Sequence, residues 1–163
     1  MTTIESLLAQ DVMVTDVLTV YEGWSIKRLS TFFIKHGISG APVIASDHEL
    51  VGVVSISDII RFENLPLDDK ALMVAEHVYM ETLGQPLLPS DMKQLAEQAV
   101  ENCTVNSIMT RKVISVEPTD PLPQVAALMC KHKIRRVFVT RSGVICGIIS
   151  SGDILAKLAT SGR

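Results

Sequence analysis

The residues that could do chemistry most readily belong to a short motif that occurs twice. Both copies have the form Gly-apolar-apolar-Ser-x-x-Asp, with Gly52, Ser55 and Asp58 in the first and Gly147, Ser150 and Asp153 in the second. We expect a strand to end at the apolar pair and a helix to begin at the Asp. A serine hydroxyl near the positive end of that helix can bind a phosphate oxygen, and an ionised carboxylate can accept both hydroxyls of a ribose cis-diol.

A single Ser-x-x-Asp at a helix start is more often a helix cap than a binding site. Here, however, Ser-x-x-Asp occurs twice at matched positions, and each time it follows a Gly and two apolar residues. Acidic residues also hold ribose in dinucleotide-binding folds. The duplication therefore favours a nucleotide-binding role over capping alone.

The remaining polar candidates favour structural roles. His36 and His132 end two predicted helices at matched positions, where the helix dipole favours them, and a phosphate contact is the less common alternative. His77 and Glu81 could bind a metal ion, but a pair without a third ligand is more often a solvated helix face. Asp47-His48-Glu49 is typical of a polar turn. We therefore expect no metal site.

The cysteines and the single tryptophan also point away from catalysis. The odd number of cysteines, without a CxxC pair, favours reduced thiols, and we expect Cys130 and Cys146 in the core. Trp24, at the start of a predicted helix, is expected to pack there, with contact to a partner as an alternative. The sequence contains no P-loop, nucleophile elbow or HExxH motif, so we expect no enzyme.

Composition excludes several classes of protein. With 47% hydrophobic and 20% charged residues, the 163-residue chain is not disordered and can build one core or two small ones. Its net charge of −3 and its lack of a basic block disfavour binding to nucleic acid or to an anionic membrane. No apolar run approaches the roughly 20 residues of a membrane span. Glu5 and Asp11 near the start argue against a signal peptide, so we expect a cytoplasmic protein.

The chain contains an internal repeat, which constrains the fold. A shift of 96 residues places Met13 on Met109 and Lys35-His36 on Lys131-His132. After one residue is lost in a turn, a shift of 95 residues places the first Gly-to-Asp motif on the second. Because these matches are collinear, they indicate a duplicated module.

Each repeat predicts the same order of elements, β-α-β-β-α. The first strands are expected at 17–20 and 113–116, the second at 41–44 and 137–140, and the third at 50–54 and 144–149. Apolar residues at helical spacing follow the first strands, and Gly37 is typical of a helix C-terminus. These residues are Ile26, Leu29 and Phe33 in the first repeat and Leu122, Val125 and Met129 in the second.

The stretch between the repeats is too long for a bare loop and predicts two helices. The first is expected to start after Asn64 and Pro66 and to stop at Gly84, and the second to be capped by Ser90 or Asp91 after a break at 85–89. The expected apolar faces are Leu72, Ala75, Tyr79, Thr82 and Leu83 in the first, and Met92, Leu95, Ala96, Ala99 and Val100 in the second.

These pieces, in this order, resemble a tandem pair of cystathionine-β-synthase (CBS) domains, a Bateman module. The matching stretches are VMVTDVLTV, KHGISGAPVI and GVVSISDII in the first repeat and SIMTRKVISV, KHKIRRVFV and GIISSGDIL in the second. The resemblance implies an α/β (α+β) fold of two β-α-β-β-α repeats packed about a pseudo-twofold axis. Its expected boundaries are 7–62 for the first domain, 63–102 for a helical insert and 103–160 for the second domain.

The resemblance further implies two clefts between the repeats that bind an adenosine ligand: AMP, ADP or ATP, less often S-adenosylmethionine or NAD. One cleft would use Asp153 for ribose and Ser150 for phosphate, with Thr19 and Ile38-Ser39-Gly40-Ala41-Pro42 holding the adenine. The other would use Asp58, Ser55, Ser115 and Ile134-Arg135-Arg136-Val137, with Arg135 neutralising phosphate. The second repeat departs from the family pattern at Phe138, where the first has Pro42.

Three hypotheses of function follow. The first is a stand-alone sensor that binds an adenine nucleotide and changes its affinity for a regulated partner, as a homodimer that pairs through the helices starting at Asp58 and Asp153. The second is a dimerisation scaffold without a physiological ligand. The third is a nucleotide-hydrolysing enzyme that uses Asp68, Asp69 and Glu76, although these carboxylates are more simply the acidic first turn and solvent face of a helix. The retention of both Ser-x-x-Asp motifs favours the first hypothesis.

Overall fold

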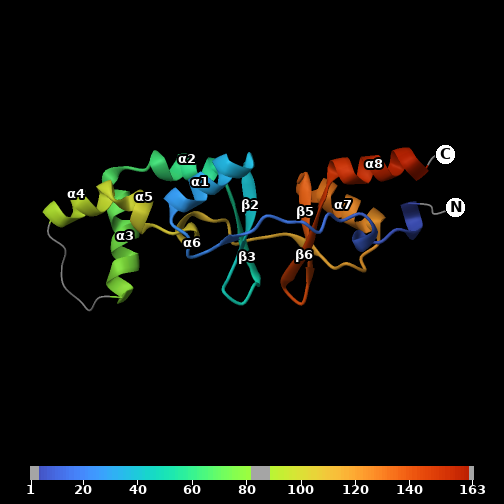
Figure 1. Cartoon of the computed structure of the whole chain (residues 1–163), viewed down its shortest axis with the longest axis horizontal. Helices are drawn as coiled ribbons and strands as arrows, with labels where there is room; N and C mark the ends of the chain where they lie inside the picture. Colours follow the sequence, from blue (N-terminus) through green and yellow to red (C-terminus); the bar gives the residue numbers. More distant parts are fainter. Residues whose placement is uncertain (1–3, 82–88, 162–163) are drawn as a thin grey trace. The chain divides into compact units, whose positions relative to one another are not determined.

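The computed structural model describes the backbone of residues 4–81 and 89–161 and the side chains of residues 4–74 and 93–160. It consists of two compact units, each with a three-stranded sheet and its own hydrophobic core (Figure 1). We call them the central unit (Thr19–Ser46 and Val51–Lys112) and the terminal unit (Met1–Leu18, Asp47–Leu50 and Val113–Arg163). The mixed α/β fold with two repeats, expected from the sequence, is confirmed.

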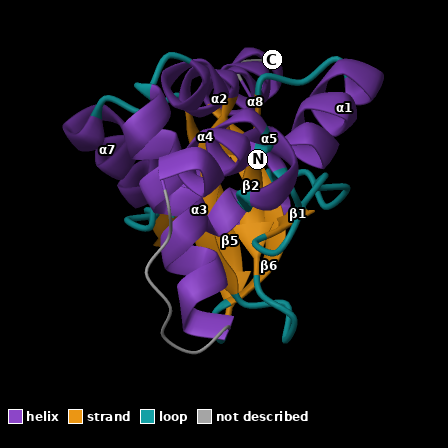
Figure 2. Ribbon diagram, turned by 90° about the vertical axis from the view of Figure 1, so that its left-hand side faces the viewer, coloured by secondary structure: helices purple, strands orange, loops and turns teal. Residues whose placement is uncertain are grey.

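The central unit contains the elements of the first repeat and the insert. Its sheet has the order β1-β2-β3, with β1 parallel to β2. The elements are β1 (Val20–Tyr21), α1 (Ile26–His36), β2 (Gly40–Ile44), β3 (Leu50–Ser55), α2 (Ile56–Glu63), α3 (Leu67–Glu81), α4 (Pro89–Glu97), α5 (Ala99–Asn102) and α6 (Val105–Ile108). The described parts of the insert, α3 to α5, are helical (Figure 2).

The terminal unit repeats the strand order of the central unit. Its sheet has the order β4-β5-β6, with β4 parallel to β5 and β5 antiparallel to β6. The elements are two short 3-10 helices (Ile4–Ser6 and Ala9–Asp11), β4 (Ser115–Val116), α7 (Leu122–His132), β5 (Arg136–Arg141), β6 (Val144–Ser150) and α8 (Ser151–Ser161).

The first helix of each repeat forms as the spacing predicts. Ile26, Leu29 and Phe33 of α1 are buried, as are the matching Leu122, Val125 and Met129 of α7. The N-terminus of α1 is capped by Ser25, whose Oγ accepts from the Arg28 amide at 3.2 Å. At the C-termini, Gly37 (φ +61°) and Lys133 (φ +53°) adopt the same left-handed conformation.

Each unit also contains a segment that leads into the opposite repeat, which we call its lead-in. The segment that ends at Leu18 leads into the first repeat but belongs to the terminal unit, and the segment that ends at Lys112 leads into the second repeat but belongs to the central unit. In the central unit the amides and carbonyls of Val53 and Thr110 exchange two hydrogen bonds of 2.9 Å. In the terminal unit Val14 and Ile148 do the same at 2.9 and 3.0 Å. The lead-in of the second repeat therefore completes the central unit, and the lead-in of the first repeat completes the terminal unit.

This exchange explains the glycine of the duplicated motif. A Cβ placed on Gly52 would lie 2.7 Å from Met109 Sδ and 2.9 Å from the Thr110 carbonyl oxygen. A Cβ on Gly147 would lie 2.5 Å from Met13 Sδ and 2.9 Å from Met13 Cβ. The third strand of each repeat needs glycine because the lead-in segment crosses it too closely for any side chain.

Several expectations about the elements are corrected. The first strands are shorter and lie later, at β1 and β4, and the second helix of each repeat begins at Ile56 or Ser151, before the Asp, because the Ser of the motif lies at the helix start. Leu72 is 54% exposed and does not lie on the buried face of α3, which Ala71 and Val74 occupy instead.

For the other apolar residues of the insert, the expected burial is confirmed wherever their side chains are described. Ala96 and Ala99 are buried, and Leu95 and Val100 pack against the core of the central unit, as expected, but they belong to two helices, α4 and α5, instead of one. Other expectations for the insert concern residues whose side chains lie outside the described part. These are the apolar residues Ala75, Tyr79, Thr82, Leu83 and Met92, the stop at Gly84 and the caps Ser90 and Asp91. Most of the expected break at 85–89 also lies outside it.

The cysteines differ from one another in burial. Cys103 is fully buried, and Cys146 is half-buried with its thiol 3.4 Å from the Val139 carbonyl oxygen. Cys130 is exposed, so its expected place in the core is wrong: it follows Met129 on α7 and points away from the buried stripe. No helix among the described residues is long and apolar enough to cross a membrane.

Candidate functional site

The first copy of the motif joins the end of β3 to the start of α2. Ser55 has extended backbone torsions, and its amide and its Oγ both donate to Asp58 Oδ2, at 2.7 and 3.0 Å. The carboxylate is only 8% exposed. Ser55 and Asp58 thus form the helix cap that the simpler interpretation predicted, but this cap uses only one oxygen of the carboxylate.

The second copy has the same geometry between β6 and α8. The amide and Oγ of Ser150 donate to Asp153 Oδ2 at 2.7 and 2.6 Å, and the Asp153 amide donates to Ser150 Oγ at 3.2 Å. Asp153 is partly exposed. The two copies therefore hold a serine hydroxyl and a carboxylate together at a helix N-terminus, where the helix dipole favours an anionic ligand.

The copies differ in what the other carboxylate oxygen does. In the first, Arg61 Nη2 donates to Asp58 Oδ1 at 2.8 Å, one turn further along α2. The residue that matches Arg61 in the second repeat is Ala156. Asp153 Oδ1 accepts no hydrogen bond from any residue that the structure describes. Of the two carboxylates, Asp153 is the one with an oxygen free to accept from a diol.

In each unit the segment after the first helix lies beside that unit's own motif. The Ile56 amide donates to the Ser39 carbonyl oxygen at 2.9 Å, and Gly40 lies against Ser55. In the terminal unit the Ser151 amide donates to the Arg135 carbonyl oxygen at 3.0 Å. The structure thus places main-chain groups next to each Ser-Asp pair, and in the terminal unit they belong to Arg135, whose side chain is exposed.

The remaining predicted site residues lie in the same two sheets or one or two residues before a strand. Thr19 precedes β1, Ser115 begins β4 opposite Phe138, and Arg136 pairs with Ser150 across β5 and β6. Ile38 is half-buried beside Gly40, Ala41 and Pro42 are buried in β2, Val137 is buried in β5, and Ile134 packs on the core of its unit. The grouping of Asp153 with Thr19 and 38–42, and of Asp58 with Ser115 and 134–137, combines the two units and stays a prediction.

The structure shows two features near Asp58 that the sequence analysis did not predict. One is Arg61, although its spacing of three residues from Asp58 on a helix is a signal that was available. The other is a small cavity of about 220 Å³ that Asp58 and Arg61 line together with Met73 of the insert and Ser107. This volume is below the roughly 300–1,000 Å³ of typical ligand pockets.

The other polar candidates whose side chains the structure describes form no reactive cluster. Within the described side chains no group of three His, Cys, Asp or Glu residues could hold a metal ion. His36 and His132 end α1 and α7 and are exposed, and the Glu49 amide donates to Asp47 as in a polar turn. Asp68 and Asp69 occupy the first turn of α3. The side chains of Glu76, His77 and Glu81 lie outside the described part.

Comparison with known proteins decides the family. The model of the CBS domain matches residues 9–64 and 105–160. The chain belongs to the CBS domain family, as a tandem pair. The uncharacterized protein MJ1426 of Methanocaldococcus jannaschii is 31% identical over 158 residues, which cover 94% of this chain and 92% of that protein.

Solved structures of CBS domain pairs show the same fold. The CBS domain pair of protein MJ0100, in complex with 5′-methylthioadenosine and S-adenosyl-L-methionine, is 25% identical with a TM-score of 0.60, covering 96% of this chain and 98% of that one. CBSX2 in complex with AMP is 20% identical with a TM-score of 0.68 and the same coverage. The CBS pairs that this chain resembles thus include proteins solved with adenosine compounds.

Proposed function

We propose that this CBS domain pair is a regulatory module that binds an adenosine nucleotide (AMP, ADP or ATP) and transmits its occupancy to a partner protein. The observation that carries the proposal is Asp153, whose Oδ2 is held by Ser150 while its Oδ1 accepts nothing from the described residues. A carboxylate held in this way can accept the two ribose hydroxyls. The start of α8 lies beside it for the phosphate, to which the Ser150 hydroxyl would donate by giving up its bond to Asp153.

The adenine would be held by Thr19 and residues 38–42, as the family resemblance implies. The Asp58 motif is the weaker ribose site, because Arg61 already occupies the second oxygen of its carboxylate. A ligand that contacts both repeats would favour the arrangement of the repeats that binds it best, and a partner that distinguishes the arrangements would then respond to the nucleotide.

A homodimer is the assembly that we propose for this module. The helices that begin at the two motifs carry exposed apolar side chains: Ile56 (42%) and Ile60 (52%) on α2 and Leu155 (63%) and Leu158 (46%) on α8. Ile34 of α1, 83% exposed, adds to the same groove as Ile56 and Ile60. Burying such side chains against a second copy is favourable, at about 25 cal/mol per Å² of apolar surface.

The test is calorimetric titration of the purified protein with AMP, ADP, ATP, S-adenosylmethionine and NADH. We expect one adenosine ligand to bind in the micromolar range and Asp153→Asn to weaken that binding by about 10- to 100-fold, because a charge-assisted hydrogen bond is lost. Asp120→Asn is the matched control, because Asp120 also accepts a backbone amide three residues earlier, in a turn of the same unit.

The alternative function is a dimerisation scaffold without a physiological ligand. A folded dimer that binds none of the five compounds would favour the scaffold and overturn the sensor. Binding that Asp153→Asn leaves unchanged would overturn the assignment of ribose to this carboxylate. Incubation with ATP and magnesium, followed by product analysis, tests the hydrolase hypothesis, for which we expect no product.

A further inference from the structure

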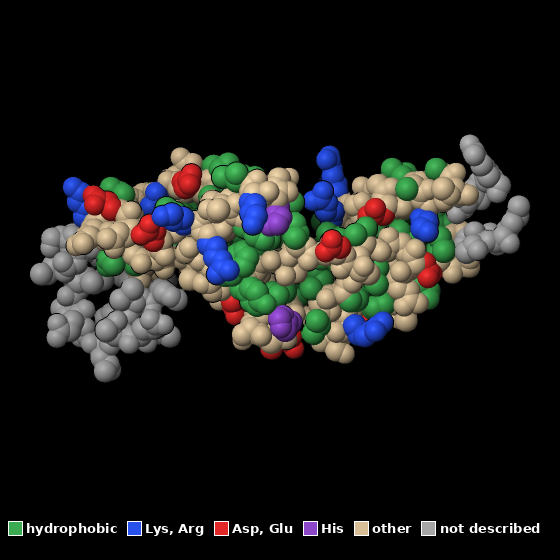
Figure 3. All heavy atoms as spheres, viewed as in Figure 1, with side chains coloured by type: hydrophobic (Ala, Val, Ile, Leu, Met, Phe, Trp, Pro, Cys, Tyr) green, Lys and Arg blue, Asp and Glu red, His purple; other side chains and the backbone are tan. Residues whose placement is uncertain are grey.

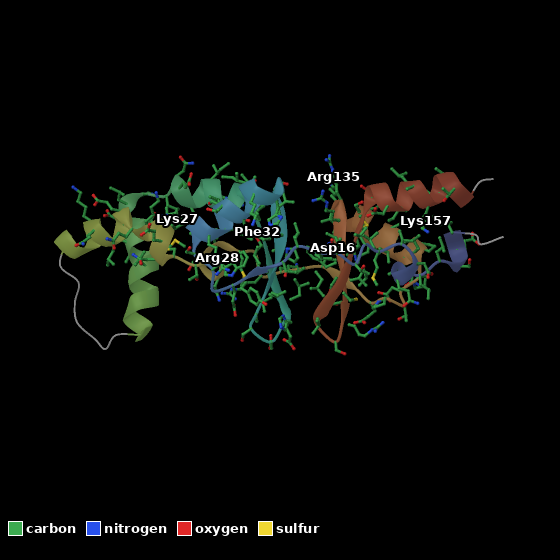
Figure 4. All side chains as sticks on the ribbon, in the orientation of Figure 1. Asp16, Lys27, Arg28, Phe32, Arg135 and Lys157 are labelled. Atoms are coloured by element: carbon green, nitrogen blue, oxygen red, sulfur yellow. The ribbon has the colours of Figure 1, made fainter. Side chains whose placement is uncertain are left out.

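Helix α1 carries a groove that neither the core nor the proposed nucleotide site uses. The groove has a volume of about 560 Å³ and is lined by Trp24, Lys27, Arg28, Phe32, Lys35 and His36, with two hydroxyl side chains. Over α1, Figure 3 shows blue and purple side chains around a green area, and Figure 4 labels Lys27, Arg28 and Phe32 there. Aromatic rings and positive charges therefore share one face of this helix.

The rings form a continuous series along the groove. Trp24 and Phe32 meet edge-on with centroids 5.2 Å apart, and Phe32 and His36 lie 4.4 Å apart. The Arg28 guanidinium lies 4.2 Å from the centroid of the Trp24 ring. Trp24 and Phe32 are both half-buried, so each leaves part of its ring accessible as apolar surface.

The charge of the groove is opposite to that of the whole protein. Three of its lining residues are Lys or Arg, and no acidic residue of the described part lines it. Lys27 forms an ion pair with Glu101 at 2.9 Å, which leaves Arg28 and Lys35 as the cations without an acidic partner among the described side chains. The protein as a whole carries a net charge of −3.

The internal repeat shows that the fold does not require this groove. The buried positions of α1 are apolar again in α7. Of the groove residues, Lys35 and His36 are retained as Lys131 and His132, but four others are not. Trp24, Lys27, Arg28 and Phe32 correspond to Asp120, Pro123, Gln124 and Leu128. A helix of the same length with the same buried stripe therefore forms in the terminal unit without these aromatic and basic side chains.

We propose that this groove docks an acidic segment of a partner protein that carries an apolar side chain. The acidic groups would lie against Arg28 and Lys35, and the apolar side chain would pack on Phe32 and on the part of the Trp24 ring that Arg28 leaves uncovered. From Trp24 to His36 the helix covers about 18 Å, which an extended segment of about five or six residues spans. An open groove of this length suits a peptide better than a small molecule, which needs an enclosed pocket.

Two observations favour a peptide over nucleic acid. Arg28 already covers the face of Trp24, so a base cannot stack there without displacing it. Two free cations are also few compared with the six to ten phosphate contacts of typical nucleic-acid binders. The surface is separate from the apolar groove of Ile34, Ile56 and Ile60, which we assign to a second copy of the chain.

The single tryptophan of the sequence is the reporter for the test. The probe is the peptide Glu-Asp-Phe-Glu-Asp-Leu-Glu-Asp, which we expect to change Trp24 emission in a saturable way. Labelled with fluorescein, the same peptide gives the affinity of each variant by anisotropy. We expect Lys35→Glu to weaken binding by about fivefold and Arg28→Glu/Lys35→Glu by tenfold or more, because rim charges contribute up to about 1 kcal/mol each.

The internal repeat provides the control. Lys131→Glu changes the exposed lysine that matches Lys35 and should leave the affinity unchanged, and thermal unfolding checks that every variant is folded. A peptide with Ser in place of Phe and Leu should bind more weakly. The proposal is overturned if the peptide does not bind, if oligouridylate binds more tightly than the peptide, if Lys131→Glu weakens binding as much as Lys35→Glu, or if the double variant changes the oligomeric state, which would make the groove an interface between copies.

Discussion

Arg61 Nη2 donates to Asp58 Oδ1 at 2.8 Å, whereas Ala156 stands at the matching position three residues after Asp153. Both Ser-Asp pairs share the two hydrogen bonds from Ser to the carboxylate, so the pairing of the second carboxylate oxygen is the difference that bears most directly on ribose binding. A ribose that binds Asp58 has to displace the guanidinium, and a ribose that binds Asp153 does not.

An exchange of these two residues should exchange the behaviour of the two motifs. Arg61→Ala in an Asp153→Asn background should raise the affinity for the adenosine ligand, and Ala156→Arg in the native protein should lower it, each by up to about fivefold. The limit follows because the Arg61 side chain is 76% exposed, and an exposed ion pair contributes at most about 1 kcal/mol. Calorimetry measures both changes, and an unchanged affinity in both variants would exclude competition by Arg61.

The glycines of the motif should be intolerant of a side chain. We expect Gly52→Ala and Gly147→Ala to lower the free energy of unfolding by about 1–3 kcal/mol, since the added Cβ meets Met109 and Thr110 in one case and Met13 in the other. Gly23→Ala is the matched control, because nothing lies within 4 Å of a Cβ there, and it should be neutral or slightly stabilising. Urea denaturation measures all three, and equal effects would contradict the close approach.

Lys133 offers a stabilising substitution. It ends α7 in the left-handed conformation that Gly37 adopts at the end of α1, and this conformation is unfavourable for a residue with a Cβ. Lys133→Gly should therefore raise the free energy of unfolding by about 0.5–1 kcal/mol, and Gly37→Ala should lower it by a similar amount. A Lys133→Gly variant that unfolds at lower urea concentration than the native protein would refute this.

The thiols should react in the order of their exposure. Burial raises the pKa of the Cys103 thiol above its ordinary value of 9.0, so this thiol stays protonated and inaccessible in the folded protein. We expect a disulfide reagent at pH 8 to modify Cys130 rapidly, Cys146 slowly and Cys103 only after denaturation. Rapid modification of all three thiols in the folded protein would contradict this order.

The same shift makes part of the stability depend on pH. The folded state binds the Cys103 proton more tightly than the unfolded state, so this contribution is complete below pH 9.0 and is lost as the pH rises above that value toward the folded-state pKa. Cys103→Ala removes the contribution. The native protein should therefore lose more stability than Cys103→Ala between pH 8 and pH 10, as the urea midpoints of both proteins at both values would show.

Much of the fold could be predicted because each element of the first repeat has a counterpart in the second, so two stretches of sequence indicate the same element. The buried stripes of α1 and α7 follow from helical spacing, and the Ser-Asp caps follow from residue type and position. The burial of Leu72 and Cys130 was predicted wrongly, because both are apolar residues next to the true buried stripe, and spacing alone does not say which neighbouring residue turns inward.

Features that depend on distant parts of the chain could not be predicted. The exchange of lead-in segments between the repeats joins Met13 to Gly147 and Met109 to Gly52, and no local pattern specifies which copy of a repeat receives which segment. The aromatic and basic groove on α1 combines residues over about three turns whose types, read singly, are those of an ordinary solvated helix.

The exchanged lead-in segments also set an order for folding during synthesis. The central unit ends at Lys112 and takes most of its chain from one stretch, so it can be completed while the second repeat is still being translated. The terminal unit needs Val14 to pair with Ile148, so Val14 leaves the ribosome long before the residue with which it pairs. Until then the backbone of the first lead-in around Val14 is unpaired, and it is the part of the nascent chain that a chaperone would have most reason to protect.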